Sequence, residues 1–561
     1  MRQESTSRAG LFCRSMRALL ALVLLAPAAL ANDSSYTTIQ SGSTATPVHD
    51  RGIRGEGQII AVLDTGADWT SCYFAEADGS RPPVNTGTQL GGLEWRNIDL
   101  SRRKIVAYNF LFSCDQFPYS SGCDDPDAAD AWDNHGHGTH AAGAAAADKG
   151  TPLVHDEGDA VAPGAKLVIQ DGGYTGGDAC SHRPGFGCPV FITPILDQAY
   201  RQGARIHSNS WGDRQGFADS PPTANYSQSA YDVDAFVWNH PDMLLVFNTG
   251  NYPGPDFRPG ALPPESTVSA PGSAKNTLQV GGTRGYSGQK DDVLADFSAI
   301  GPTRDGRIKP DVVGPAYVSA AHPGSCLATE QEGTSWAAPT IAGAAALVRQ
   351  YYMEGFYPGG AGNPVNRRNP SAALLKATII AAARHVPGRV TRSSLYDTEP
   401  VPSYEQGFGF PVLDDALYFA GDRRRLRVYD VQSLHGLQEG EGVATTLEVR
   451  AGSELKAVLV WTDPPGRVAG IGDATPQLVN DLDLLLITPQ GTPIHGNDRL
   501  HPGQPDRLNN VEAITIESPE EGRYSIAVSA ARIGQGTRQG YALVITGDFA
   551  EPLPRRRAAG R

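Results

Sequence analysis

The chain has 561 residues, with 47 basic and 61 acidic side chains that give a formal net charge of −14. This length accommodates about two to four domains. The 64 glycines and 42 prolines are frequent, but they stay below the level of disordered or collagen-like chains. The negative charge argues against nucleic acids and anionic membranes as partners. Beyond the N-terminal segment, no apolar run is long enough to span a membrane.

The first 31 residues have the pattern of a secretory signal peptide. Arg14 and Arg17 precede a short apolar stretch at 18–26, and Ala29 and Ala31 form an Ala-x-Ala end. A stretch of this length is too short for a membrane anchor. The sequence therefore predicts export to the medium or periplasm, with cleavage after Ala31. Residues 32–50 are polar and turn-rich, and we expect an extended arm there.

Residues 51–422 alternate apolar runs with helix-like stretches, which predicts a doubly wound α/β domain with a mostly parallel sheet and helices on both faces. The expected strands are 58–63, 167–169, 204–207, 244–247 and 278–280. The expected helices are 139–147, 194–202, 231–239, 337–350 and 371–383. The helix at 337–350 is small and apolar on nearly all sides, so we expect it to be buried at the centre.

The sequence pattern changes in residues 425–549, where short stretches of alternating apolar and polar residues are separated by Gly, Pro and Asn turns. This pattern predicts a second domain, an antiparallel β-sandwich. Its expected strands are 445–450, 455–461, 482–487, 513–517, 524–529 and 541–545. The basic tail 550–561 is expected to be disordered.

An even number of cysteines follows the predicted signal peptide, which in an exported chain indicates disulfides. Cys114 and Cys123, and likewise Cys180 and Cys188, lie close together in loops rich in Gly, Asp and Pro. We expect a short bridge within each pair. Cys72 and Cys326 are then left to pair with each other.

Three short motifs carry the chemistry. Asp64-Thr65-Gly66 ends the first expected strand, where α/β folds place functional groups. A strand-ending Asp is often only a cap or turn residue. Aspartic proteases need two such motifs so that two carboxylates can share a proton, and only one occurs here.

The second motif, 134–140, contains His135, His137 and His140 among glycines. Its spacing does not place two histidines one helical turn apart before a glutamate, as a zinc-binding helix would. A single histidine acting as a general base fits better, with glycines that admit close approach of the backbone.

The third motif, 333–339, places Ser335 directly before the expected buried helix. A serine there is often a helix cap. The same position suits a nucleophile, because the helix dipole and the serine N–H stabilise a developing oxyanion. The Gly-x-Ser-x-Gly sequence of α/β-hydrolases is absent from the chain.

The order Asp64, His137, Ser335 is that of subtilisin-like serine proteases (subtilases), and the sequence around each residue resembles this family. Further similar segments are 161–165, 208–212, 250–251, 271–276 and 297–311. Residues 425–548 resemble the jelly-roll domain that follows the catalytic domain in kexin-like and some bacterial alkaline subtilases. The resemblance implies a secreted serine endopeptidase that forms an acyl-enzyme.

The resemblance also implies the role of each matched residue. Ser335 would attack the scissile carbonyl, His137 would move the proton, and Asp64 would orient the imidazole. Asn251 would be the second oxyanion donor, with Asn248 as a nearby alternative. The family's second, structural histidine matches His140.

Substrate peptides are expected to bind by strand addition between two segments. Residues 213–216 lack the acidic pair with which kexins read basic residues, so we expect broad specificity with apolar or aromatic residues before the cut. The residues expected to bind substrate are Ser210, Trp211, Gly212, Asn248, Thr249 and Gly250.

Two departures from the family pattern stand out. Trp336 replaces the methionine that most subtilases carry beside the serine, which predicts activity that tolerates peroxide. Only 32 residues separate Ala31 from Asp64, less than the propeptide that subtilases usually carry.

Structural calcium is a further implication of the resemblance. Oxygen ligands of the kind calcium prefers gather in the acidic loop that ends at Asp133, and at Asp481 and Asp483. Solvated acidic loops are the alternative interpretation.

Protein and peptide substrates are the expected partners, no organic cofactor is expected, and we expect a monomer. Two other functions stay open. One is an inactive relative whose sandwich domain binds a protein or a cell surface. The other is a metal-dependent hydrolase that uses the histidine cluster.

Overall fold

The computed structural model describes residues 35–88, 92–111, 133, 136–150, 155–174, 185–186, 191–212, 224–252, 266–286, 289–390, 395–470 and 472–550. The predicted signal peptide, the pairs Cys114–Cys123 and Cys180–Cys188, the segment 213–216 and the basic tail from 551 lie outside these residues. Within them, no helix has the length and apolar character needed to cross a membrane.

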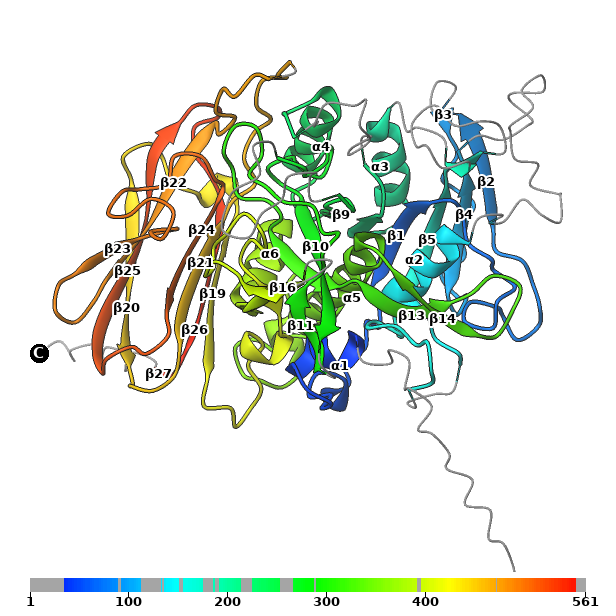
Figure 1. Ribbon diagram of the computed structural model, residues 1–561, viewed down its shortest axis with the longest axis horizontal. Helices are drawn as coiled ribbons and strands as arrows, with labels where there is room; N and C mark the ends of the chain where they lie inside the picture. Colours follow the sequence, from blue (N-terminus) through cyan, green and yellow to red (C-terminus); the bar gives the residue numbers. More distant parts are fainter. Residues whose placement is uncertain are drawn as a thin grey trace, which may run out of the picture. The chain divides into compact units, whose positions relative to one another are not determined.

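A mostly parallel sheet of twelve strands forms the first part of the described chain (Figure 1). Its order is β17-β16-β11-β10-β9-β8-β1-β5-β4-β2-β3, with β12 paired to β10. The strands are β1 (Ile59–Asp64), β2 (Val84–Thr88), β3 (Gly92–Leu93), β4 (Ile105–Phe110), β5 (Lys166–Asp171), β8 (Ile206–Asn209), β9 (Leu244–Asn248), β10 (Leu278–Tyr286), β11 (Gln289–Leu294), β12 (Val312–Pro315), β16 (Gly388–Val390) and β17 (Leu395–Asp397).

The apolar runs explain the centre of this sheet. β1 lies between β5 and β8, and both pairings are parallel. Nearly every residue of these strands is buried, because helices cover both faces. The five strands expected from the sequence are confirmed, and the α/β fold with a mostly parallel sheet is as predicted.

The helices follow the predicted pattern with one addition. They are α2 (His137–Ala146), α3 (Ile192–Arg201), α4 (Gln228–Asn239), α5 (Thr334–Met353) and α6 (Ala372–Ala381). In α5, every residue from Thr334 to Tyr352 is buried, which confirms the expected central helix. The addition is α1 (Ser35–Ser41), in the segment expected to be extended. It forms there because Ile39 and Gln40 are completely buried against the domain.

Small two-stranded sheets complete this part. They are β6 (Gly173–Tyr174) with β7 (Gly185–Phe186), β13 (Tyr317–Ala321) with β14 (Ala328–Glu332), and β15 (Ala383–Arg384) with β18 (Phe410–Pro411). Short 3-10 helices are η1 (His49–Arg51), η2 (Pro364–Asn366), η3 (Leu413–Asp415) and η4 (Ser433–His435). The β13–β14 hairpin leads directly into α5.

Two antiparallel sheets follow, with orders β19-β26-β21-β24 and β23-β22-β25-β20-β27. Apolar side chains from both sheets form one common core. The jelly-roll connectivity itself stays a prediction. The strands are β19 (Arg425–Val431), β20 (Gly442–Val449), β21 (Leu455–Val460), β22 (Asn480–Ile487), β23 (Pro493–His495), β24 (Val511–Ile516), β25 (Gly522–Ile533), β26 (Tyr541–Gly547) and β27 (Phe549–Ala550).

The two central strands of the first sheet, β21 and β26, are buried on both faces. Their inner face lies in the sandwich core. Apolar residues of their other face belong to the core cluster that also contains the apolar side chains of α6: Val458, Val460, Ala542 and Val544. Consequently every residue of β21 and β26 is buried. The two parts of the chain thus share a continuous apolar boundary.

Buried polar contacts also join the α/β part to the sandwich at this boundary. The Lys275 ammonium donates to the Asp463 carboxylate and to the carbonyl oxygens of Pro464, at 2.6 Å, and Gln477, at 2.9 Å. Both charged side chains are completely buried. Asn276 donates through its side-chain amide to the Asp463 carbonyl at 2.9 Å. Burial makes these bonds stronger than they would be in water.

Candidate active site

Asp64 and His137 form a direct pair at the end of β1. Asp64 Oδ1 lies 2.6 Å from His137 Nδ1. The Asp64 side chain is 3% exposed, and that of His137 is 22% exposed. The backbone N–H of Thr65 donates to the same Oδ1 at 2.8 Å. This contact orients the imidazole with Nδ1 toward the carboxylate, which leaves Nε2 as the atom that can exchange a proton with a substrate or a nucleophile.

Close approach of two backbones brings the first two motifs together. A Cβ atom placed on Gly138 would lie 2.0 Å from the carbonyl oxygen of Gly66, so no side chain fits at this position. The Gly138 N–H donates to Thr65 Oγ1 at 2.8 Å. The glycines of the two motifs are therefore a geometric requirement for the Asp64–His137 contact.

Asp133 holds the start of α2. Its carboxylate accepts hydrogen bonds from the N–H groups of Gly136 (2.8 Å) and Thr139 (2.7 Å). It also accepts from the hydroxyls of Thr139 (2.6 Å) and Thr65 (2.9 Å). Burial raises the pKa of Asp133 above its usual range. The sequence interpretation counted this residue among calcium ligands, whereas the structure uses it to cap the helix that carries His137.

Ser335 lies in the first turn of α5 and is 7% exposed. Pro339 has no N–H, so the Ser335 carbonyl lacks the donor that a helix normally supplies four residues later. Ser210 takes over this role, because its hydroxyl donates to the Ser335 carbonyl at 2.6 Å. In return, Ser335 Oγ lies 3.5 Å from the Ser210 carbonyl oxygen.

Trp336 places the start of α5 against two histidines of the second motif, His137 and His140. Its ring centroid lies 4.7 Å from that of His137 and 4.3 Å from that of His140. Burial lowers the pKa of His140 to about 3, and its Nε2 lies 3.1 Å from the Val318 carbonyl oxygen. His140 is therefore neutral and structural, while His137 faces both Asp64 and the residue next to Ser335.

The two candidate oxyanion donors differ in exposure. Asn251 is exposed, and its Oδ1 accepts from the N–H of Thr334 at 2.8 Å and from its hydroxyl at 2.7 Å. These bonds fix the orientation of the amide, so its NH₂ group is the end left to donate. Asn248 is buried, and its NH₂ donates to Thr334 Oγ1 at 3.3 Å. The geometry favours Asn251.

Sequence reasoning overlooked the positioning roles of Thr65, Asp133 and Thr334. Thr65 and Thr334 stand inside the recognised motifs, next to Asp64 and Ser335. That adjacency is a usable signal, because a threonine hydroxyl beside a functional residue can fix a neighbouring amide or carboxylate.

The expected substrate-binding segments follow adjacent parallel strands. Asn209 pairs with Phe247 in the register of β8 and β9, so residues 210–212 and 248–250 leave the sheet side by side. Trp211 packs its ring 5.6 Å from that of Phe247. A Cβ on Gly212 would lie 2.6 Å from Ser269 Oγ. Ser210 contacts Ser335 and Asn248 contacts Thr334, so both segments begin beside the start of α5.

Asp481 and Asp483 do not form the predicted calcium site. Arg507 Nη1 lies 3.0 Å from Asp481 Oδ2 and 2.5 Å from Asp483 Oδ1, so one guanidinium pairs with both carboxylates. Asp481 Oδ1 is buried without a hydrogen-bond partner, and burial raises the pKa of Asp481 to about 6. Across the described part of the chain, no three His, Cys, Asp or Glu side chains are placed to hold a metal ion. These residues do not fit calcium.

Comparisons with known proteins agree with this geometry. A family model described as the subtilase family matches residues 55–409. The chain is similar to the serine protease/ABC transporter B family protein tagD of Dictyostelium discoideum, with 24% identity over 89% of this chain and 32% of that protein.

Bacterial relatives match about half of the chain. Subtilisin BL of Lederbergia lenta is 27% identical over 54% of this chain and 81% of its own length. Bacillopeptidase F of Bacillus subtilis (strain 168) is 24% identical over 53% of this chain and 18% of its own length. This chain spans about a third of the Dictyostelium proteins that it matches.

Proposed function

This chain belongs to the subtilase family, and we propose that it is a serine endopeptidase whose catalytic triad is Asp64, His137 and Ser335. The observation that carries the proposal is the 2.6 Å contact between His137 Nδ1 and Asp64 Oδ1. The packing of the Trp336 ring on His137 supports the assignment of Ser335 as its partner.

Each residue of the proposed triad has a defined task. Ser335 Oγ attacks the scissile carbonyl carbon while His137 Nε2 accepts the hydroxyl proton, and a tetrahedral intermediate forms. His137 then delivers that proton to the amine, the C–N bond breaks, the amine leaves and the acyl-enzyme remains. The Asp64 carboxylate stabilises the imidazolium that exists between these steps. Water hydrolyses the acyl-enzyme by the same proton transfers in reverse.

The oxyanion of the tetrahedral intermediate is proposed to be bound by the Asn251 side-chain NH₂ and the Ser335 N–H. Support comes from the Thr334 contacts that use the Asn251 oxygen as an acceptor. The first N–H groups of a helix have no acceptor within the helix, which makes the Ser335 N–H available.

The proposed substrates are extended polypeptides that pair with residues 210–212 and 248–250. No charged side chain occurs among these six residues, which supports broad specificity with apolar or aromatic residues before the cut. A peptide library cleaved only after paired basic residues would overturn this preference. The proposal includes export directed by residues 1–31 and action as a monomer, and it contains no step that depends on a metal.

The test is hydrolysis of casein by the purified protein and by Ser335→Ala. We expect activity in the wild type alone, together with labelling of Ser335 by a fluorophosphonate. Asp64→Asn keeps the shape of the site and is expected to lower kcat by about 10⁴. Equal activity of the wild type and Ser335→Ala would refute the assignment. A wild type that neither cleaves casein nor reacts with the fluorophosphonate would favour a binding role.

A further inference from the structure

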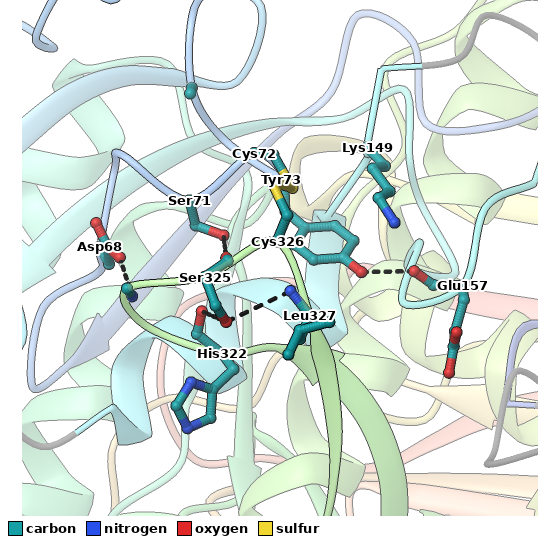
Figure 2. The surroundings of a disulfide bond; sticks show 12 residues. Asp68, Ser71, Cys72, Tyr73, Lys149, Glu157, His322, Ser325, Cys326 and Leu327 are labelled. Atoms are coloured by element: carbon teal, nitrogen blue, oxygen red, sulfur yellow. Dashed lines mark hydrogen bonds between the residues drawn. A yellow bond between two sulfur atoms is a disulfide. The ribbon is translucent and has the colours of Figure 1, made fainter.

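The tip of the β13–β14 hairpin, residues 322–327, touches each of the segments that carry the proposed triad. We call this segment the hairpin tip. Figure 2 shows its surroundings, centred on the disulfide between Cys72 and Cys326. The two cysteines are 254 residues apart in sequence, with their Cα atoms 5.3 Å apart. The sequence analysis expected this pairing, because Cys72 and Cys326 remained after the other four cysteines were paired.

The first contacts join the hairpin tip to the segment that follows Asp64. Cys72 stands eight residues after Asp64. Between them, Asp68 Oδ2 accepts the Gly324 N–H at 2.6 Å, and the Ser71 hydroxyl donates to the Ser325 carbonyl at 3.3 Å (Figure 2). The disulfide is the covalent part of this junction.

The second contacts join the hairpin tip to the helix of His137. A Cβ on Gly136 would lie 2.8 Å from Pro323 Cγ, so the proline ring rests on the residue just before His137. Asp68 also takes part here, because its N–H donates to Thr139 Oγ1 at 2.8 Å. Asp68 thus bonds the hairpin tip through its carboxylate and the His137 helix through its backbone.

The third connection runs along the hairpin to Ser335. β13 and β14 pair without interruption from Ala321–Ala328 to Tyr317–Glu332. The Gly333 N–H then donates to the Ala316 carbonyl at 2.9 Å, two residues before Ser335. A displacement of the hairpin tip is therefore transmitted through a paired ribbon to the start of α5.

The disulfide is also accessible to thiols. Cys326 and its neighbour Leu327 are exposed, whereas Cys72 is partly buried. Thiol–disulfide exchange requires access of a thiolate to a sulfur atom. Without the disulfide, the junction depends on the Asp68 and Ser71 hydrogen bonds, and an individual hydrogen bond contributes only about 1 kcal/mol.

We propose that the Cys72–Cys326 disulfide is a redox-sensitive positioning element that aligns Asp64, His137 and Ser335. The proposal rests on the triad assigned above. A dithiol donates two electrons and two protons to the Sγ–Sγ bond, producing thiols at Cys72 and Cys326 and an oxidised, cyclic disulfide of the reagent. The reduced enzyme is the less active form, and reoxidation restores activity.

The experiment compares the oxidised enzyme with the enzyme reduced by dithiothreitol under native conditions. Peptide mapping without reduction first verifies the Cys72–Cys326 cross-link, and its absence would overturn the proposal. Kinetics of a chromogenic peptide are normalised to active sites titrated with fluorophosphonate. We expect kcat to fall roughly tenfold on reduction with KM within about twofold, because misalignment by about 1 Å is costly to catalysis.

The matched control is Cys72→Ser/Cys326→Ser, which retains the remaining cysteines. It should have the kcat of the reduced wild type and should not respond to dithiothreitol. Unchanged kcat on reduction would refute the proposal, as would a lower melting temperature with the same kcat per active site. Ser335→Ala is measured in parallel, so failure of the triad assignment is recognised separately.

A second pair of variants tests the junction without redox chemistry. Asp68→Ala removes the acceptor of the Gly324 N–H, whereas Asp68→Asn retains an oxygen acceptor. In the oxidised enzyme, we expect Asp68→Ala to lower kcat several-fold and Asp68→Asn to stay near wild type. Equal kcat values for both variants and the wild type would contradict a positioning role of the hairpin tip.

Discussion

Replacing Asp463 by leucine removes the acidic partner of Lys275 at the boundary between the α/β part and the sandwich. Both side chains are completely buried, and Asp463 also accepts the N–H groups of Val479 at 3.0 Å and Asn480 at 2.7 Å. In the variant, the Lys275 ammonium keeps only carbonyl acceptors, and both N–H groups lose their acceptor.

The contacts give the size of the effect. Removing one partner of a buried ion pair costs about 3–5 kcal/mol, because the other charge stays buried without compensation. A buried donor left without a partner costs about 1–3 kcal/mol. We therefore expect Asp463→Leu to lower the free energy of unfolding by about 5 kcal/mol or more. Lys275→Met/Asp463→Leu leaves no unpaired charge, and a loss of about 2–6 kcal/mol should remain for the two N–H groups.

The assay is urea unfolding followed by tryptophan fluorescence, for the wild type, Asp463→Leu and the double variant. Glu448→Leu serves as the control, because Glu448 and Arg523 form an ion pair of the same kind in an exposed position, where such pairs contribute little. The reasoning is refuted if Asp463→Leu and the double variant unfold at the same urea concentration. Equality would mean that no buried charge was left unpaired.

Three further predictions concern the site and the sandwich. Asn251→Ala should lower kcat by about 10²–10³. Asn251→Asp keeps an acceptor for Thr334 but lacks the NH₂ donor, so it should show a similar loss of kcat in peptide kinetics. A wild-type kcat in the aspartate variant would contradict the donor role. Casein hydrolysis by the wild type should survive dilute peroxide while Trp336→Met loses activity through sulfoxide formation, and equally fast inactivation of both would disprove the benefit of tryptophan. Burial and the nearby carboxylate of Asp506 raise the pKa of Glu512 well above its usual range, so the stability that its protonation contributes is present at low pH and is lost as pH rises through that pKa. Glu512→Gln keeps an acceptor for the Leu484 N–H, now 2.7 Å from Glu512 Oε2. Its melting temperature should gain on that of the wild type as pH rises above the ordinary pKa of a glutamate. A difference in melting temperature that stays constant with pH would show that Glu512 does not titrate in this range.

The sequence predicted the parts of the fold that depend on local composition. Continuous apolar runs predict β1, β5 and β9, because strands covered on both faces need no polar positions. β4 was missed since Tyr108 and Asn109 interrupt its apolar run, and Asn109 is satisfied by an amide hydrogen bond from Gln202 that no local pattern reveals. α1 was missed for a similar reason, because tertiary burial rather than propensity stabilises a segment rich in Ser and Thr.

In the candidate site, too, features set by local sequence could be predicted and features set by long-range contacts could not. The positions of Asp64 and Ser335 at the ends of expected elements made them candidates, and the resemblance to subtilases implied His137 among the three histidines of its motif. The pairing of Asp481 and Asp483 with Arg507 depends on a residue 24 positions further along the chain. Local acidic composition cannot distinguish ligands that await a cation from carboxylates that already have an arginine. Long-range pairing of this kind requires the fold.

Pro339 has an effect one helical turn away from where it stands. Because its missing N–H leaves the Ser335 carbonyl to the Ser210 hydroxyl, the segment proposed to dock a substrate and the backbone of the proposed nucleophile share a hydrogen bond. This bond links the two directly, without passing through the histidine. The proline thus couples the two proposed parts of the site through a hydrogen-bond acceptor that it leaves vacant within the helix.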